Sequence, residues 1–324
     1  MSTIRVMQLS EERRAEWEDF ICRANNGTVF HRLSFLDYHP SERFAFHHLM
    51  FYKDDTLIAA LPASITDGRL KSPAGASFGG FVVPPRLDLR TADQIIKELL
   101  TYCHNINVKE ILITPPMQVY SKTFDESIEY AMLYNHFRQD CALYSSVIDL
   151  SQICDKTDLS RNTRHKINKA VNKNVRIAES DAFEEFYPIL LKNKAKFGVQ
   201  PTHTLEELRR IHALVPGMMK LFVAYHETKP IAGELLFAAN DRCILNFYTM
   251  HLYEYRNLFA VNYLVEHALR WSVQQGYRYY DYGVSADTFS SDPMEPSWSL
   301  VWLKESMGAA GCMRKTYSRT IVNK

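Results

Sequence analysis

The chain has 324 residues, of which 46% are hydrophobic, and its net charge is +1 at pH 7. This length predicts two domains of ordinary size, with one large domain as the alternative. The near-neutral charge gives no sign of a protein that binds DNA or a membrane through its overall charge, although a local basic patch is compatible with it. The six cysteines include no Cys-x-x-Cys pair, which predicts reduced thiols and neither a disulfide framework nor a zinc site.

Targeting and metal-binding patterns are also missing from the sequence. The amino-terminal segment is charged and lacks the apolar core of a signal peptide. No apolar run approaches ~20 residues, the length that a membrane-spanning helix needs. The twelve histidines show no spacing typical of metal ligands. We therefore expect a soluble, cytoplasmic protein without a catalytic metal.

The first half begins with a predicted hairpin that is followed by a helix and a strand. Residues 50–60 have the pattern of two strands around a charged turn, and a polar turn at Thr66–Arg69 begins a third strand. Residues 92–103 have helical spacing and residues 108–114 are strand-like. We place the domain boundary just before the next strand, which gives domains at 1–144 and 145–324, with packing of the carboxyl-terminal segment back on the first domain as an open alternative.

A run of cations follows this boundary. Ser160 is a good N-cap for a helix. The basic residues of this helix are Arg161, Arg164, His165, Lys166, Lys169 and Lys173. Arg161 and Arg164 are candidates for contact with an RNA backbone or with a phosphorylated acceptor. The alternative is that these charges form an ordinary solvated face.

The segment from Lys229 to Gly283 is the most informative part of the chain. It predicts a strand, a tight turn at Asn240–Asp241, a second strand, a helix and a third strand. Apolar residues recur at helical spacing from Leu258 to Val273, and Gly276 suits a left-handed helix stop. Parallel strands joined by a helix have their carboxyl ends at one edge, where α/β proteins tend to bind ligands.

This segment has a weak counterpart in the first half. Tyr52 corresponds to Tyr225 and Ile58 to Ile231, a shift of 173 residues in both cases. The later helix and strand of the first half match those of the second half at a shift near 169. Two duplicated domains explain this order better than a solenoid, whose repeats are ~20–50 residues long. Chance similarity between two hairpins is the alternative.

The second half resembles the GNAT superfamily of acyltransferases, and within it the tandem-domain Fem-type (FemABX-like) branch. The segments that carry this resemblance are Ser145–Ile177, Phe186–Thr204, Lys229–Thr249, Tyr279–Gly283 and Leu300–Gly311, and more weakly Thr28–His39 and Gly75–Pro84. The resemblance implies an α/β fold with a mixed sheet, built from two tandem GNAT-like domains packed together. It also implies the transfer of an acyl group to an amine.

The resemblance leaves two donors open. One branch uses acyl-CoA, and the other uses aminoacyl-tRNA to extend a peptidoglycan precursor. Enzymes that use CoA usually have a Gly-rich turn with an arginine where the central helix begins, so that backbone N–H groups can hold the diphosphate. Here the turn contains Arg256 and Asn257 but no glycine. The residues expected to hold the donor are Arg256, Asn257, Asn246 and Tyr282.

Acyl transfer needs a neutral amine, donors for the oxyanion and a proton for the leaving group. Asp281 at the end of the last strand is expected to act as a base or to orient the amine, unless it only caps a loop. Glu234 is a second candidate base, acting through a water, unless it is a solvent-facing strand residue. Tyr248 and Asn246 are expected on one strand face as donors, or as a polar edge of the core. By the resemblance, Lys304 lies near the transfer centre; otherwise it is a surface lysine.

The acceptor is expected to meet residues of both halves. The candidates are Lys192, Lys196 and the loop at 198–203 in the second half, with His31, Arg32 and Phe35 in the first. The sequence therefore predicts an acyltransferase that modifies a primary amine of a small molecule or a cell-envelope precursor. The first domain would be a degenerate copy that binds the acceptor. A binding protein that has lost catalysis in both domains is the alternative from another class.

Overall fold

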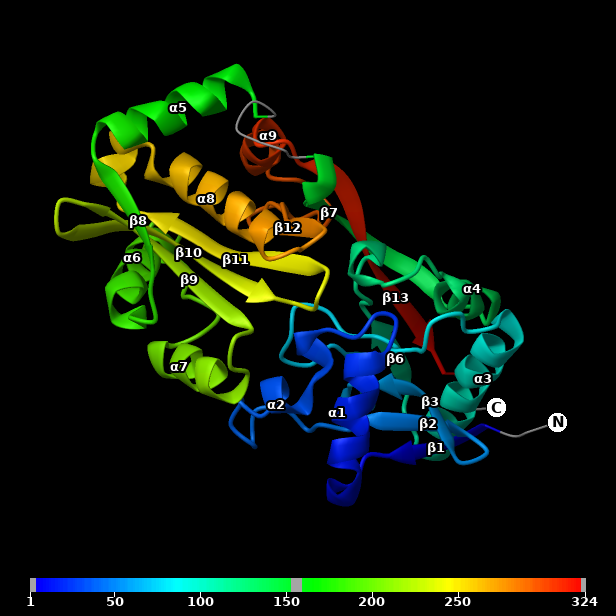
Figure 1. The fold of residues 1–324 in the computed structure, drawn as a ribbon. Helices are drawn as coiled ribbons and strands as arrows, with labels where there is room; N and C mark the ends of the chain where they lie inside the picture. Colours follow the sequence, from blue (N-terminus) through cyan, green and yellow to red (C-terminus); the bar gives the residue numbers. More distant parts are fainter. Residues whose placement is uncertain (1–3, 153–158, 322–324) are drawn as a thin grey trace. The chain divides into compact units, whose positions relative to one another are not determined.

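The computed structural model describes residues 4–152 and 159–321 of the chain. These residues form two compact units (Figure 1). The first unit contains residues 4–143, 291–294 and 313–321, and the second contains residues 144–152, 159–290 and 295–312. The carboxyl-terminal segment therefore belongs to the first unit, while the residues just before it belong to the second.

The first unit contains seven strands, counting the carboxyl-terminal one. The strands of its amino-terminal part are β1 (Ile4–Gln8), β2 (Leu49–Lys53), β3 (Thr56–Leu61), β4 (Ser64–Thr66), β5 (Arg69–Ser72) and β6 (Glu110–Ile113). Its helices are α1 (Arg14–Arg23), α2 (Leu33–Leu36), α3 (Leu89–Asn105) and α4 (Ser127–Tyr134). β1, β2 and β3 form an antiparallel sheet. β5 pairs antiparallel with β4 and parallel with β6.

The second unit contains a longer mixed sheet. Its strands are β8 (Val175–Glu179), β9 (Met219–His226), β10 (Lys229–Ala238), β11 (Cys243–His251) and β12 (Tyr279–Val284), together with the end of β7 (Arg138–Asp149). Its helices are α5 (Arg161–Asn172), α6 (Phe183–Ala195), α7 (Leu205–Leu214), α8 (Ala260–Gln274) and α9 (Trp298–Ser306). β8 to β11 are antiparallel neighbours, and β12 pairs parallel with β11.

The two units repeat one order of elements. In each unit a strand pairs antiparallel with the first strand of a hairpin, as β1 does with β2 and β8 with β9. Later in each unit come a helix and a strand that is parallel to the preceding strand, which are α3 and β6 in the first unit and α8 and β12 in the second. The structure confirms the element order from which the repeat was predicted.

Each unit also contains a strand that, in the sequence, comes after a helix of the other unit. β7 comes after α4 of the first unit, but its residues Ser145–Asp149 pair antiparallel with β12 of the second. β13 (Ala310–Thr320) comes after α9 of the second unit, and its residues Tyr317–Thr320 pair antiparallel with β6 of the first. The two equivalent strands are therefore exchanged, and neither unit is built from one continuous stretch of chain.

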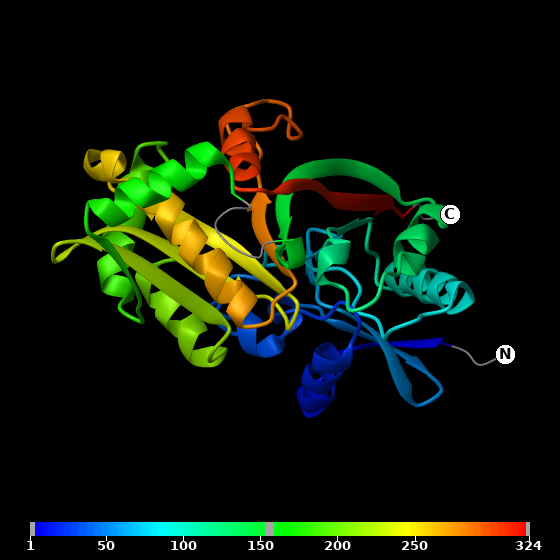
Figure 2. The same cartoon turned by 45° about the horizontal axis from the view of Figure 1, so that its top comes forward.

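Helices cover both faces of the second unit's sheet (Figures 1 and 2). On one face, Ala232, Leu236 and Ala238 of β10 share a buried core with Leu264 and Ala268 of α8. On the other face α6 packs against β10 and β11. Because side chains alternate along a strand, from Ala232 onward the even-numbered residues of β10 point toward α8 and the odd-numbered ones toward α6.

The boundaries predicted from the sequence lie close to those observed. Ser160 caps α5, since its side chain accepts a hydrogen bond from the backbone N–H of Thr163. Gly276 follows α8 in the left-handed region, with φ of 83°. The five cysteines in the described part form no disulfide with one another, and Cys154 lies outside the described residues.

Gly233 provides a test of how closely α6 packs on the sheet. A Cβ atom at this position would lie 2.3 Å from Cδ2 of Phe186 in α6. We expect Gly233→Ala to lower the free energy of unfolding by about 1–3 kcal/mol because the core is overpacked, as measured by urea denaturation. Phe186→Leu should relieve the clash, so the double variant should be more stable than the sum of the two single effects predicts. Simple additivity would contradict this interpretation.

Candidate functional site

The parallel ladder of the second unit is short and ends where polar residues gather. β11 and β12 pair at Cys243 with Tyr279, at Ile244 with Tyr280 and at Leu245 with Asp281. Beyond these paired residues, β11 continues to His251 and β12 continues to Val284. Because α8 connects the two strands, their carboxyl ends lie at the same edge of the sheet, where α/β proteins tend to bind ligands.

A β-bulge decides which side chains face this region. In the ladder between β10 and β11, Leu236 pairs with Asn246 and Leu235 pairs with Tyr248, so Phe247 is the extra residue. Paired residues point to the same face of a sheet, and a bulge reverses the alternation. Asn246 therefore lies on the face covered by α8, whereas Tyr248 lies on the opposite face. The prediction that both lie on one face is wrong for this reason.

Glu234 of β10 is at the centre of a buried hydrogen-bond network. Its side chain is fully buried, and Oε1 accepts hydrogen bonds from Nδ2 of Asn246 at 2.7 Å and from the hydroxyl of Tyr280 at 2.5 Å. Thr249 Oγ1 lies 3.5 Å from the same oxygen and donates to Oδ1 of Asn246 at 2.9 Å. Two strands, β11 and β12, thus supply three donors to one carboxylate oxygen. The alternative that Glu234 faces solvent is wrong.

The second carboxylate oxygen of Glu234 has no hydrogen-bond partner among the described residues, and neither has the buried hydroxyl of Tyr282. Burial raises the pKa of Glu234 to about 7, against the opposing effect of the hydrogen bonds from Tyr280 and Thr249. Burial and the nearby charge of Glu234 raise the pKa of Tyr282 well above its ordinary value. The carboxyl group can therefore gain and lose a proton near neutral pH, while the Tyr282 hydroxyl stays protonated.

Asp281 and Lys304 hold the backbone that follows β12. Asp281 Oδ1 accepts hydrogen bonds from Oγ of Ser145 at 2.9 Å and from the backbone N–H of Gly283 at 2.7 Å. The ammonium of Lys304 donates to the carbonyls of Gly283 and Val284 at 2.8 and 3.1 Å and to Oγ of Ser285 at 2.8 Å. Both side chains are buried, and Asp281 faces away from Glu234 because it alternates with Tyr280 and Tyr282 along β12. Lys304 is therefore not the surface lysine of the alternative interpretation.

Tyr248 anchors the loop that was predicted to line an acceptor pocket. Its hydroxyl accepts a hydrogen bond from the backbone N–H of Thr202 at 3.1 Å, and burial raises its pKa. Nζ of Lys196 lies 3.2 Å from the ring centroid of Tyr253, and Lys192 is exposed on α6. These residues lie on the side of the sheet covered by α6, opposite Glu234.

The amino terminus of α8 is open and surrounded by cations. It follows the 3₁₀ turn η6 (Tyr253–Leu258), and the N-cap residue Phe259 is left-handed with φ of 55° and makes no side-chain cap. Lys173 of α5 donates to the Asn257 carbonyl at 3.3 Å, and Nζ of Lys169 lies 5.6 Å from the Phe259 ring centroid. Arg256 is exposed in the same turn. Free N–H groups and cations together favour an anion here.

The corresponding helix of the first unit is closed to anions. The carboxylate of Asp88 caps α3 and accepts a hydrogen bond from the backbone N–H of Thr91 at 2.9 Å. The polar network has also been replaced. A shift of 173 residues aligns Leu61 with Glu234, and a shift of 169 aligns Ile111 and Ile113 with Tyr280 and Tyr282. All three residues of the first unit belong to its buried apolar core.

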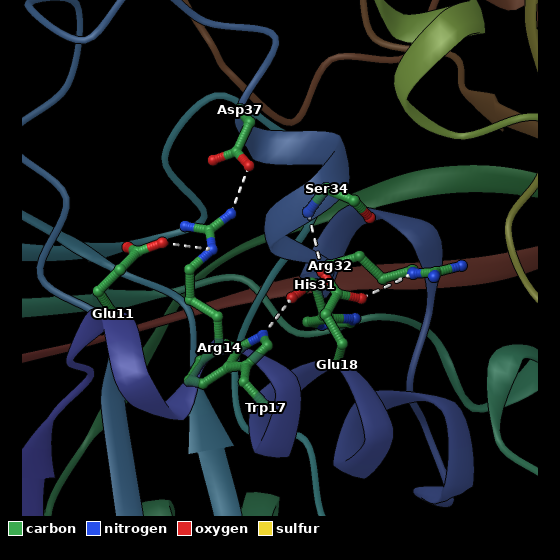
Figure 3. A network of polar contacts seen from close by, with 8 residues as sticks. All are labelled: Glu11, Arg14, Trp17, Glu18, His31, Arg32, Ser34 and Asp37. Carbon is green, nitrogen blue, oxygen red and sulfur yellow. Dashed lines mark hydrogen bonds and ion pairs between the residues drawn. The ribbon is translucent and has the colours of Figure 1, made fainter.

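The predicted acceptor residues of the first unit have packing roles in the structure (Figure 3). His31 is buried between Thr28 and the carbonyl of Gly79, its own carbonyl accepts a hydrogen bond from the Trp17 indole, and burial lowers its pKa to about 4. Arg32 forms an ion pair with Glu18, which also accepts a hydrogen bond from the backbone N–H of Ser34. Phe35 is buried against Phe30.

The same part of the first unit contains a second ion-pair group around Arg14. Its guanidinium lies between the carboxylates of Glu11 and Asp37 (Figure 3). These pairs are partly exposed, and such pairs contribute up to about 1 kcal/mol each. They fix α1 relative to the short α2, so the polar side chains seen here support the fold of the first unit.

Sequence reasoning missed Tyr280 and Thr249 as parts of the Glu234 network. Tyr280 and Tyr282 alternate with Asp281, and this alternation indicates a second polar face of the strand. The sequence-based prediction placed the base on the face of Asp281. Thr249 could not be placed, because the bulge at Phe247 changes its face. The described residues contain no group of three or more His, Cys, Asp or Glu side chains arranged to hold a metal ion. Every helix in the described part is too short or too polar to span a bilayer.

Comparison with known proteins agrees with this architecture. The acetyltransferase (GNAT) domain family matches residues 158–291. The curated protein sequences contain no significant match. The crystal structure of FemX is similar with a TM-score of 0.71 and 13% identity, over 98% of this chain and 97% of that one. L-PGS from Bacillus licheniformis is similar with a TM-score of 0.62 and 12% identity, over 98% and 94%.

A further similar structure is a tandem GNAT protein from the clavulanic acid biosynthesis pathway. Its TM-score is 0.57 at 10% identity, over 99% of both chains. At such low identities these likenesses concern the fold alone, and they extend over nearly all of this chain. Together with the match of the acetyltransferase (GNAT) domain at residues 158–291, they show that the chain has a tandem GNAT fold, with the matching domain in its second half.

Proposed function

We propose that this protein is an N-acyltransferase that moves an acyl group from acyl-CoA to a primary amine, with Glu234 as the general base. The observation that carries the proposal is the buried carboxyl of Glu234, whose pKa is raised to about 7 and whose Oε2 has no partner among the described residues. A base works best when its pKa is close to the working pH. The acceptor class is a small-molecule amine or the amine of a cell-envelope precursor.

The reaction follows from the placement of three groups. The amine loses a proton to the carboxylate of Glu234, directly or through a water at its unpartnered oxygen. The amine nitrogen forms a bond to the thioester carbonyl carbon, and the C–S bond then breaks. Tyr282, whose hydroxyl stays protonated, is the candidate donor of a proton to the departing thiolate. Asn246 and Tyr280 hold the carboxylate in place through Oε1.

The donor's phosphates are assigned to the amino terminus of α8. Its N-cap residue makes no side-chain hydrogen bond to the first N–H groups, and Lys169, Lys173 and Arg256 supply positive charge. The first unit has an aspartate cap and an apolar core at the equivalent places. We therefore assign no chemistry to the first unit and keep acceptor binding as its expected role.

A second candidate donor is aminoacyl-tRNA. One observation favours it: the left-handed N-cap position of α8, where glycine would allow the closest approach of a diphosphate, is occupied by Phe259. The helix α5 also has basic residues and no acidic residue over its whole length. If this donor is correct, the reaction at Glu234 is unchanged, and the leaving group is the ribose hydroxyl of the tRNA.

The first prediction concerns the base. Replacing Glu234 by glutamine keeps the size of the side chain and removes its ability to accept a proton, so kcat should fall by about 10²- to 10⁴-fold. In the wild type, kcat/KM should rise with pH and level off above about 7, because the carboxylate is the active form. The measurement is thiol release from acetyl-CoA in the presence of a panel of primary amines.

Asp281→Asn is the matched comparison for this experiment, because Asp281 lies on the other face of β12. It should reduce stability more than it reduces the rate of the folded protein. If Asp281→Asn abolished turnover of folded protein and Glu234→Gln did not, Asp281 would be the base. If neither variant changed thiol release or ligand binding, the alternative of a binding protein without catalysis would be supported.

The second prediction concerns stability. The pKa of Glu234 is higher in the folded protein than in the unfolded chain, so its contribution to stability is fully present below pH 4.5 and is lost as the pH rises through 7. Glu234→Gln should therefore be more stable than the wild type at pH 8, by about 3 kcal/mol at most, and equally stable at pH 4. Urea unfolding at both pH values measures this, with the exposed Glu254→Gln as control. An equal change in the free energy of unfolding for Glu234→Gln and Glu254→Gln would refute the raised pKa of Glu234.

The third prediction distinguishes the donors. Alanine at both Arg256 and Lys173 should raise the Kd of acetyl-CoA about tenfold or more, because two charges near the phosphates are removed. If aminoacyl-tRNA is the donor, alanine at both Arg161 and Arg164 should weaken tRNA binding and flatten its dependence on salt. Calorimetry and filter binding measure the two affinities. Lys71→Ala, on an exposed position of the first unit, should leave both unchanged.

A further inference from the structure

Three lysines of α5 form a row that connects two other elements of the second unit. Lys166, Lys169 and Lys173 are three and four residues apart, so they lie on one face of the helix and span about 10 Å. Nζ of Lys166 lies 5.9 Å from the ring centroid of Trp302 in α9. Lys169 and Lys173 reach the turn before α8, at the Phe259 ring and the Asn257 carbonyl.

Trp302 is an unusually exposed aromatic residue beside this row. It is 60% exposed, on the outward side of α9, whereas Val301 and Lys304 form the inward side. The start of α5 lies beside α9 in both views, and Oγ1 of Thr163 donates to the carbonyl of Ser306 at 3.0 Å (Figures 1 and 2). The indole ring is thus held at one end of the lysine row, and the open amino terminus of α8 lies near the other end.

We propose that Trp302 and the lysine row bind the nucleotide part of the donor, an adenosine with phosphates at its 3′ and 5′ positions. The purine stacks on the exposed face of the Trp302 ring. The phosphates bind along Lys166, Lys169 and Lys173 and at the amino terminus of α8. Stacking on an aromatic ring together with a row of cations is the usual way to bind a nucleotide without reading its base. This inference rests on the proposed function and adds a base-binding element to it.

The charges around Trp302 favour a nucleotide over a lipid surface. The sequence from Arg161 to Lys173 contains no acidic residue, so the row repels cations and attracts phosphates. On the same side of α9, four residues before and three residues after Trp302, the Trp298 indole donates to Glu295 at 3.2 Å, and Glu305 accepts a hydrogen bond from Tyr144 at 3.0 Å. These carboxylates oppose the approach of an anionic bilayer to the whole of α9. A small anion at the lysine row avoids them.

The test uses calorimetry with the full chain and three probes: adenosine 3′,5′-bisphosphate, adenosine and inorganic diphosphate. Trp302→Leu should weaken binding of the bisphosphate about tenfold, as expected for the loss of one base stacked on an aromatic ring. It should leave the binding of diphosphate unchanged. Lys166→Met should weaken both phosphorylated probes. Both side chains are solvent-accessible, so folding should be preserved, which urea unfolding checks.

Trp298→Leu is the matched control, because Trp298 is 69% exposed on the same helix but its indole is hydrogen-bonded to Glu295. It should bind all three probes like the wild type. If Trp298→Leu weakens the bisphosphate as much as Trp302→Leu does, or if Trp302→Leu has no effect, the proposal is overturned. Equal affinity of the wild type for diphosphate and bisphosphate would also overturn it, since the base would then contribute nothing.

The source of the nucleotide is decided by competition. Displacement of the bisphosphate by coenzyme A supports a CoA donor. Stronger displacement by a short RNA supports the same platform for an RNA-borne adenosine, since an internal adenosine of RNA also has phosphates at its 3′ and 5′ positions. None of these measurements requires turnover. Failure of the platform with an intact effect of Glu234→Gln would leave the proposed function standing, and the opposite result would leave a nucleotide-binding protein without the proposed chemistry.

Discussion

The candidate chemistry of the second unit depends on a carboxyl group that is buried without a counter-charge. Glu234 forms no ion pair with the residues that the structure describes, and its Oε1 is held only by neutral donors from β11 and β12. A buried carboxylate of this kind is costly, because desolvation destabilises its charged form. This destabilising carboxyl group lies next to the end of the short parallel ladder between β11 and β12. The same desolvation raises the pKa of Glu234 to about 7.

The first unit has the same fold without a buried carboxyl group at the position equivalent to Glu234. Leu61, Ile111 and Ile113 fill the places of Glu234, Tyr280 and Tyr282 and pack in a continuous apolar core. The amino terminus of α3 is closed by its aspartate cap, while that of α8 is left open. The same fold therefore occurs twice in this chain, once with apolar and once with polar side chains at these positions. The polar side chains of the second unit are thus not required for the fold, although a reaction would require them.

Exchange of β7 and β13 explains why neither unit could be cut out of the sequence at a single boundary. The strand after α4 completes the second sheet, and the strand after α9 completes part of the first. β7 passes from one unit to the other between residues 143 and 144. A linear division near this position would place all later residues in the second unit, although residues 313–321 belong to the first. Strand pairing is a long-range interaction, and no local pattern in the sequence encodes it.

The sequence by itself determined the order of elements, the duplication and the position of the basic helix, because periodicity, turn residues and caps act over a few neighbouring residues. Only the tertiary structure decided which polar side chains meet. The bulge at Phe247 sends Asn246 and Tyr248 to opposite faces. Asp281 and Lys304, both chosen from the sequence, hold backbone, whereas Tyr280 and Thr249 join Glu234. One extra residue in a strand reverses the face of every later side chain, and the pairing with a neighbouring strand fixes where that residue lies.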